Sequence, residues 1–403
     1  MYGGELAVRR LLVPVGLFLV IAALGLLFLP RDTYNPQRVT QRGSSMMQME
    51  NQVKAQAAAV ITTHWEGNAY AIPDDPELET DSKAPPLCEG SSLSTPRQVV
   101  DVPVATLWSQ PNQARAMDHP ALQNPAPIKS WLRTMSIPDK LWLVGKLETQ
   151  VLLGTEVAVL GEQGDWVQVT VPDQATPKNE NGYPGWVPKV QIAERTIAYD
   201  ACPVAVVSKP TAWLYEDAVS DRSTEEISFN TKLPVLTAEG SRVGAAVREG
   251  EIRWIEKADV KIMEPSMPAD QLTLQVTGGE LVNTAQGFLD LPYLWSGTSG
   301  FGFDCSGFTY AIHQFHGIDI PRDAKDQARQ GTAVALADIE PGDLLFYAYD
   351  KGKGKVHHVA MYIGDGKMIH SPRTERSIEI ISIHTPSYAQ EFAGACRYTA
   401  ISI

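Results

Sequence analysis

The stretch Phe303-Asp304-Cys305-Ser306-Gly307-Phe308 follows a glycine-rich run and opens a segment with helical periodicity. Phe308, Ile312 and Phe315 recur at positions i, i+4 and i+7, which places them on one helix face. Gly317 then provides a stop signal. Cys305 is therefore expected in the first helical turn, where unpaired N–H groups and the helix dipole favour a thiolate. An isolated cysteine is more often a small buried side chain. A catalytic role for Cys305 therefore needs support from residues elsewhere in the chain.

Residues 356–364, Val-His-His-Val-Ala-Met-Tyr-Ile-Gly, predict a strand, and Asp-Gly at 365–366 turns the chain into a second strand that carries His370. Alternation along a strand puts His358 and Ala360 on one face. A two-residue loop would pair His370 with Met361, on the face away from His358. A three-residue loop would place His370 opposite Ala360, on the same face as His358.

The second register suits nucleophilic catalysis. It would provide a cysteine, a histidine to act as its base, and another histidine to orient that base. Ala360 is small and would leave room for the helix that bears Cys305 to pack on this face of the sheet.

Four ordered motifs resemble those of the NlpC-type cell-wall peptidases. They are Phe-Asp-Cys-Ser-Gly-Phe at 303–308, Pro-Arg-Asp at 321–323, Pro-Gly-Asp-Leu-Leu-Phe at 341–346, and His-Val-Ala-Met-Tyr-Ile-Gly at 358–364. These papain-like cysteine enzymes cut the stem peptides of bacterial peptidoglycan. The resemblance implies an α+β catalytic domain over residues 270–403, with the cysteine helix packed on an antiparallel sheet. In it, Cys305 would be the nucleophile, His358 the base and His370 the orienting residue.

Further roles follow from the same resemblance. Tyr293 lies twelve residues before Cys305, the position from which the family's tyrosine contributes its hydroxyl to the oxyanion site. Trp295 and Ser306 would contact the substrate, although Tyr293 and Trp295 could instead be aromatic core residues. No cofactor or metal is implied, because no carboxylate or thiol at metal-ligand spacing completes a cluster with the histidines.

Two β-rich segments precede the catalytic domain. Short apolar runs with Gly and Pro punctuation over residues 99–194 predict a small barrel. Its Gly-Asp-Trp-Val and Gly-Trp-Val-Pro pieces resemble bacterial SH3-like domains, and residues 203–263 look like a second, more divergent copy. Such modules serve as packed spacers or as wall-binding domains.

The first SH3-like domain contributes to the substrate pocket in some NlpC-type enzymes. Glu148 and Tyr183 stand where those enzymes carry a glutamate and a tyrosine facing the cleft. The resemblance implies that Glu148 and Asp304 neutralise the free ammonium of an N-terminal L-alanine, while Tyr183 closes the site. Glu148 could otherwise be a solvated surface charge.

The N-terminus predicts membrane attachment. Residues 11–29 are nineteen residues without a charge, about the length needed to cross a bilayer. We expect an uncleaved single-pass anchor within residues 1–30 rather than a cleaved signal peptide, followed by a helical stalk and linker over residues 31–98. The flanking arginines leave the orientation open; a wall hydrolase needs its body outside the cytoplasm. There, Cys88 and Cys202 could form a disulfide, or both could stay reduced.

The composition sets the remaining limits. A length of 403 residues with 44% hydrophobic content suits several packed domains. The net charge of −13, without a basic stripe, argues against nucleic acid as a partner. The resemblance to the NlpC-type peptidases implies hydrolysis of the D-γ-glutamyl–diamino acid bond in peptidoglycan stem peptides or muropeptides. The alternatives are another papain-like amidase or acyltransferase of the cell wall, or a catalytically idle wall-binding protein.

Overall fold

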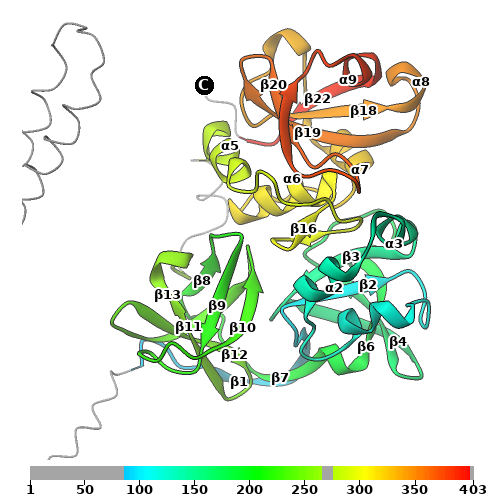
Figure 1. Ribbon diagram of the computed structural model, residues 1–403. Coiled ribbons are helices and arrows are strands. Elements are labelled where there is room, and N and C mark those ends of the chain that lie inside the picture. Colours follow the sequence, from blue (N-terminus) through cyan, green and yellow to red (C-terminus); the bar gives the residue numbers. More distant parts are fainter. Residues whose placement is uncertain (1–85, 266–275, 400–403) are drawn as a thin grey trace, which may run out of the picture. The chain divides into compact units, whose positions relative to one another are not determined.

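The computed structural model describes residues 86–265 and 276–399 (Figure 1). The expected membrane anchor at residues 1–30, and most of the stalk and linker expected at 31–98, lie outside these residues. Within the two described ranges, no helix is both long enough and apolar enough to span a bilayer.

The first β domain is a seven-stranded sheet with the strand order β3-β2-β6-β5-β4-β1-β7. Its elements are β1 (Ser91–Val100), β2 (Val104–Trp108), η2 (Ala116–Leu122), α2 (Ile128–Thr134), α3 (Ile137–Trp142), β3 (Leu147–Leu152), β4 (Glu156–Gln163), β5 (Trp166–Val171), β6 (Tyr183–Pro188), η3 (Lys189–Gln191) and β7 (Ile192–Ala198). Strand β1 begins inside the stretch that the sequence suggested was linker, because it pairs with β7 from Ser91 onwards.

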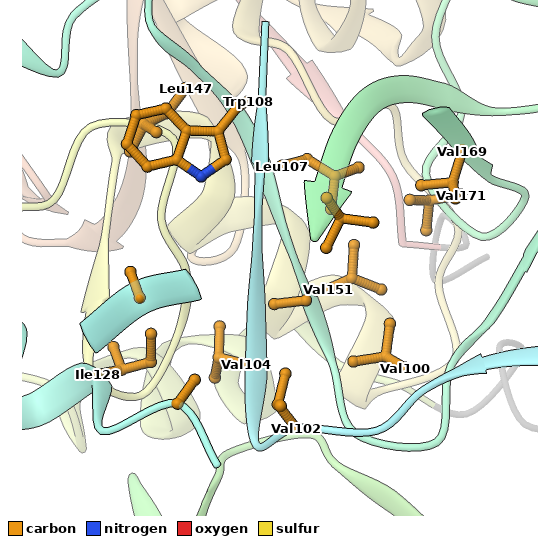
Figure 2. Close-up of a cluster of buried hydrophobic side chains, with 14 of the residues drawn as sticks. Val100, Val102, Val104, Leu107, Trp108, Ile128, Leu147, Val151, Val169 and Val171 are labelled. Atoms are coloured by element: carbon orange, nitrogen blue, oxygen red, sulfur yellow. The ribbon is translucent and has the colours of Figure 1, made fainter. Parts of the chain in front are cut away.

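Apolar side chains from both sides of this sheet form its core. Figure 2 shows Leu107, Val151 and Val169 gathered there, and all three are buried. The helical insertion between β2 and β3, which the sequence analysis did not anticipate, adds Ile128 and Trp131 to the same core.

The second β domain repeats the arrangement, with the order β10-β9-β13-β12-β11-β8-β14. Its elements are β8 (Val204–Val207), β9 (Thr211–Tyr215), β10 (Ser223–Ser228), β11 (Lys232–Glu239), β12 (Arg242–Arg248), β13 (Glu251–Glu256), η4 (Lys257–Asp259) and β14 (Val260–Met263). A disulfide between Cys88 and Cys202 ties the chain before β1 to the connection between the two β domains.

The C-terminal domain combines helices with a six-stranded antiparallel sheet of order β17-β22-β18-β19-β20-β21. Its elements are α5 (Gly278–Gln286), β15 (Thr298–Ser299), β16 (Gly302–Phe303), α6 (Cys305–Phe315), α7 (Ala324–Gln330), β17 (Thr332–Val334), η5 (Leu336–Asp338), β18 (Leu344–Ala348), α8 (Tyr349–Gly352), β19 (Val356–Gly364), β20 (Lys367–His370), β21 (Glu379–Ser382), α9 (Pro386–Glu391) and β22 (Phe392–Arg397).

Helix α6 lies against the sheet beside β19 (Figure 1). Phe308 and Ile312 are fully buried in one core with Val359 and Met361 of β19. Ala360 points to the other face of the sheet and packs in a separate cluster beneath α9. The expectation that α6 packs over Ala360 was therefore wrong: strand alternation separates the two faces but does not say which one a helix covers.

The β19–β20 hairpin sets the register of His370. Its loop has two residues, Asp365 and Gly366, with φ angles of 50° and 64°, the left-handed values that a type I′ turn requires. A bulge between Tyr362 and Gly364 then shifts the pairing by one residue, so that Met361 lies opposite Ile369. Continuing that register sets His370 opposite Ala360 and on the face of His358. The chain thus combines the short loop of one alternative with the pairing of the other.

Strand β3 of the first β domain docks directly on the loop that precedes α6. The Trp295 indole and the Ser296 hydroxyl both donate to the Leu147 carbonyl, at 3.2 and 2.8 Å. The Thr298 hydroxyl donates to the Gln150 carbonyl at 3.0 Å. These buried bonds fix β3, and with it Glu148, beside the catalytic domain.

Candidate active site

Cys305 begins α6, as its sequence context predicts. The Asp304 side chain caps the helix by accepting a hydrogen bond from the Gly307 N–H at 2.6 Å. Gly307 is required there, because a Cβ atom would come within 2.0 Å of the Gly297 carbonyl oxygen. The loop and the helix start are thereby held in close contact, and the thiol is kept at a defined position.

Burial dominates the ionisation of this thiol. It raises the pKa of Cys305 to about 12, and the neighbouring Asp304 carboxylate adds to the rise. The backbone N–H groups of Val359 and Ser306 act in the opposite direction but are outweighed. The helix position alone favours a thiolate; in this structure desolvation of the half-buried Cys305 acts against it and favours the protonated thiol.

The two histidines expected to assist Cys305 lie together on adjoining strands. Nε2 of His358 is 2.9 Å from Nδ1 of His370, within hydrogen-bond distance. Both rings are buried, at 4% and 0% exposure. Burial lowers the pKa of His358 well below its usual value and that of His370 to about 3, so both imidazoles are neutral at pH 7.

A carboxylate and two tyrosine rings surround the histidine pair. None of them was singled out from the sequence. Glu379 lies directly opposite His370 in the β20–β21 pairing, with Oε1 at 3.3 Å from Nε2. That approach lacks the alignment of a hydrogen bond. Tyr347 and Tyr388 pack their rings on His358, with centroids at 5.8 and 5.6 Å. The tyrosines come from β18 and α9, far apart in sequence, so only the fold brings them to the histidines.

Tyr293 is a buried neighbour of Cys305. Burial raises the pKa of its hydroxyl well above the usual value, and the charge of a Cys305 thiolate would raise it further. The hydroxyl therefore stays protonated and can donate a hydrogen bond. Trp295 is half-buried at the junction with the first β domain, and both rings line a hollow of about 390 Å³ together with Leu141 and Arg373.

Asp304 is committed to an ion pair that the sequence analysis did not foresee. Arg322, from the Pro-Arg-Asp motif, donates to both of its carboxylate oxygens at 3.2 and 2.8 Å and also to the Ser306 hydroxyl at 3.0 Å. Arg322 is only 1% exposed, and its Nε reaches Thr149 of β3 at 3.1 Å. Asp304 was expected to bind a substrate ammonium. In this structure its carboxylate is already paired with the Arg322 guanidinium.

Two of the residues expected to bind an N-terminal ammonium, Glu148 and Tyr183, share a contact with Lys178, whereas Asp304 is held by Arg322. The Tyr183 hydroxyl, from β6, donates to the carboxylate of Asp323 at 3.1 Å. Lys178, from the β5–β6 loop, places its Nζ 2.6 Å from Glu148 Oε2 and 2.6 Å from the Tyr183 oxygen. Glu148 is thus paired with a cation and is not a freely solvated charge.

Known families match two parts of this chain. Residues 290–397 match the model of the NlpC/P60 family, and residues 207–262 match that of the YKFC SH3b2 domain. The chain is 47% identical over 308 residues to a gamma-D-glutamyl-L-lysine dipeptidyl-peptidase of Bacillus cereus, covering 74% of this chain and 90% of that protein. A protein of the same name from Bacillus subtilis is 42% identical over 296 residues, covering 73% of this chain and 96% of that protein.

The fold is shared as well. A crystal structure of an NlpC/P60 family protein from Bacillus cereus superposes with a TM-score of 0.70 at 46% identity, covering 75% of this chain and all of that one. These matches show that the chain is a cysteine peptidase. The chain belongs to the NlpC/P60 family.

Proposed function

We propose that this peptidase hydrolyses the D-γ-glutamyl–L-diamino acid bond of peptidoglycan stem peptides or muropeptides. The observation that carries the proposal is the buried His358–His370 pair, whose Nε2 and Nδ1 atoms are 2.9 Å apart. Although α6 covers the other face of the sheet, its first residue reaches this pair: the Cys305 sulfur is contacted by the backbone N–H of Val359, the residue after His358, and the charge of its thiolate would act on Tyr388, whose ring packs on His358. Relatives that align over nine-tenths or more of their length are named gamma-D-glutamyl-L-lysine dipeptidyl-peptidases, which supports this bond as the target.

The chemistry follows from the tautomers. His358 donates its Nε2 proton to Nδ1 of His370, which leaves Nδ1 of His358 to take the thiol proton. The sulfur of Cys305 then attacks the γ-carbonyl carbon, and the C=O electron pair moves to oxygen. Because both partners rest in the neutral form, proton transfer accompanies attack and does not precede it.

The tetrahedral oxyanion is stabilised by the Tyr293 hydroxyl and the backbone N–H of Cys305, with each such donor contributing about 2–4 kcal/mol. His358 returns the proton to the leaving α-amine as the C–N bond breaks. A thioester to Cys305 remains. Water, deprotonated by His358, attacks this thioester, releases the dipeptide acid and restores the thiol.

The junction with the first SH3-like domain would set specificity. Glu148 supplies a carboxylate for the free ammonium of an N-terminal L-alanine, and Tyr183, only 2% exposed, closes the space beyond it. A stem peptide still joined to glycan has no such ammonium and would lose this charge-assisted contact. We therefore propose a preference for peptides with a free N-terminal L-alanine.

We also place the catalytic domain outside the cytoplasm, attached to the membrane by the N-terminal segment. Support comes from the Cys88–Cys202 disulfide, since disulfides persist mainly in oxidising compartments, and from the location of peptidoglycan. Cysteine-accessibility labelling in intact cells would test the orientation: label reaching the catalytic domain only after lysis would contradict it.

Digestion of defined peptides tests the activity. The full chain is incubated with L-Ala-γ-D-Glu-L-Lys and with its N-acetylated form, and products are identified by mass spectrometry. We expect L-Ala-D-Glu and lysine from the first peptide and at least about tenfold lower kcat/KM for the second. Cleavage at another bond would contradict the proposed reaction, and equal rates would contradict the role of the free ammonium.

A further inference from the structure

The Lys178 side chain occupies the place where the substrate ammonium is expected. Its Nζ lies 2.6 Å from Glu148 Oε2 and 2.6 Å from the Tyr183 oxygen. The same Nζ stands over the Tyr183 ring, 4.2 Å from its centroid. A carboxylate, a hydroxyl and an aromatic face are the groups that recognise an alkylammonium. Lys178 therefore makes, within the chain, the contacts that an N-terminal amine would make.

The charge surrounding Lys178 explains why it stays there. Asp323 accepts from Tyr183 at 3.1 Å, and Asp326 is close enough for the Lys178 charge to lower its pKa, although burial raises that pKa overall. Asp326 also faces Lys325 and Arg329, at 3.9 and 3.7 Å, and Arg322 is paired with Asp304. Lys178 is the cation that pairs with Glu148.

The backbone around Lys178 is fixed, whereas the side chain can move. Gln174, at the start of the loop, is buried and bonded to Thr149 and to the Gln150 carbonyl at 2.6 and 2.7 Å. Gly182, at its end, has a φ of 107° and packs its Cα against Val171. The Lys178 side chain itself is 35% exposed. Rotation about its own bonds would carry Nζ into solvent on the nanosecond timescale of exposed side chains.

We propose that Lys178 is a specificity-determining residue, an internal competitor that the N-terminal ammonium of the substrate must displace from Glu148 and Tyr183. A peptide without a free ammonium cannot replace the cation and leaves Lys178 in place. A peptide with a free ammonium replaces the Lys178 ammonium with its own. This inference deepens the proposed function and rests on it.

The competition sets a measurable penalty on substrate affinity. If the lysine occupies the site most of the time, the apparent affinity falls by the fraction of time that the site is free. A partly exposed ion pair is worth at most about a factor of five, so we expect a weakening of about twofold to fivefold.

Steady-state kinetics of the full chain with Lys178→Met test this. Methionine keeps an unbranched side chain as far as the ε position and removes the charged ammonium. For L-Ala-γ-D-Glu-L-Lys we expect KM to fall about twofold to fivefold, with kcat within about twofold of the parent. Lys189→Met is the matched control, since Lys189 pairs with Glu162 on the same domain, and its KM should equal that of the parent.

A double-mutant cycle identifies the site of competition. In a Glu148→Gln background KM should be raised, and adding Lys178→Met should then change little, because the contested carboxylate is gone. A KM that rises or stays constant in Lys178→Met, while Glu148→Gln raises it, would overturn the competitor role and leave the proposed function standing. If Glu148→Gln leaves KM unchanged, the ammonium subsite itself fails.

Discussion

Nε2 of His358 and Nδ1 of His370 face each other at 2.9 Å in the buried centre of the catalytic sheet. Burial keeps both rings neutral, with the pKa of His370 lowered to about 3. One proton therefore lies between two neutral nitrogens, and its position decides which nitrogen of His358 can act as the base. In the proposed mechanism, His370 holds that tautomer.

Replacing His370 with alanine removes the acceptor that holds the tautomer. We expect kcat to fall at least about 100-fold while KM changes little, because His370 holds the base and touches no substrate in the proposed mechanism. His370→Gln keeps an acceptor oxygen and should recover part of the loss. Steady-state kinetics on a γ-D-glutamyl peptide measure both.

The neighbouring histidine provides the control. His357 points to the other face of β19, where it stacks on Tyr349 at 4.3 Å and approaches Glu391 at 3.1 Å. His357→Ala should keep kcat within about twofold of the parent. Equal losses in the His357 and His370 variants would mean that the strand was damaged and that no specific role had been removed.

Cys305 should react with alkylating agents in a strongly pH-dependent way. Burial raises the pKa of its thiol to about 12, so the thiolate fraction grows about tenfold per pH unit well below that value. We expect the iodoacetamide rate to rise about 100-fold from pH 7 to 9, with Cys305→Ser subtracted to remove any reaction of Cys396. A rate already constant above pH 7 would indicate a preformed thiolate.

The ion pair between Arg322 and Asp304 should matter for stability. Arg322→Ala leaves a carboxylate buried without its cation, which costs about 3–5 kcal/mol of unfolding free energy. Arg97→Ala breaks an exposed pair with Glu156 and should cost less than about 1 kcal/mol. Urea unfolding of the two variants beside the parent measures the difference; similar losses would contradict the assignment.

Acid should destabilise the fold through buried neutral imidazoles. Burial lowers the pKa of His313 to about 4, whereas an unfolded histidine titrates near 6.5. Between these values the unfolded chain binds one more proton, so stability is present above about pH 6.5 and declines as the pH falls, by about 1.4 kcal/mol per unit. His313→Gln should show a shallower decline between pH 6 and 4.5; an unchanged slope would exclude this contribution.

Much of the catalytic domain follows from local sequence. The period of Phe308 and Ile312 predicts α6, and strand alternation around His358 predicts β19 with the bounds that the structure has. The side of the sheet on which α6 packs does not follow, because Ala360 and Val359 would each suit a helix. The bulge near Gly364 also could not be predicted from the length of the loop alone.

Charge pairs between residues far apart in the sequence could not be predicted from it, for a different reason. Arg322 stands in a motif, but its partner Asp304 was expected to bind substrate, and nothing local links the two. Lys178 and Glu148 are thirty residues apart, and Glu379 meets His370 only through the β20–β21 register. Such contacts depend on which strands become neighbours, and periodicity carries no information about that.

The acyl-enzyme is the most direct test of the central claim, that Cys305 attacks the γ-D-glutamyl carbonyl with His358 as its base. The full chain would be mixed with L-Ala-γ-D-Glu-L-Lys, quenched in acid within milliseconds and digested for mass spectrometry. We predict an L-Ala-γ-D-Glu adduct on the peptide that contains Cys305, absent from Cys305→Ser, which should also lack turnover. Full turnover by Cys305→Ser, or an adduct on any other residue, would contradict the account.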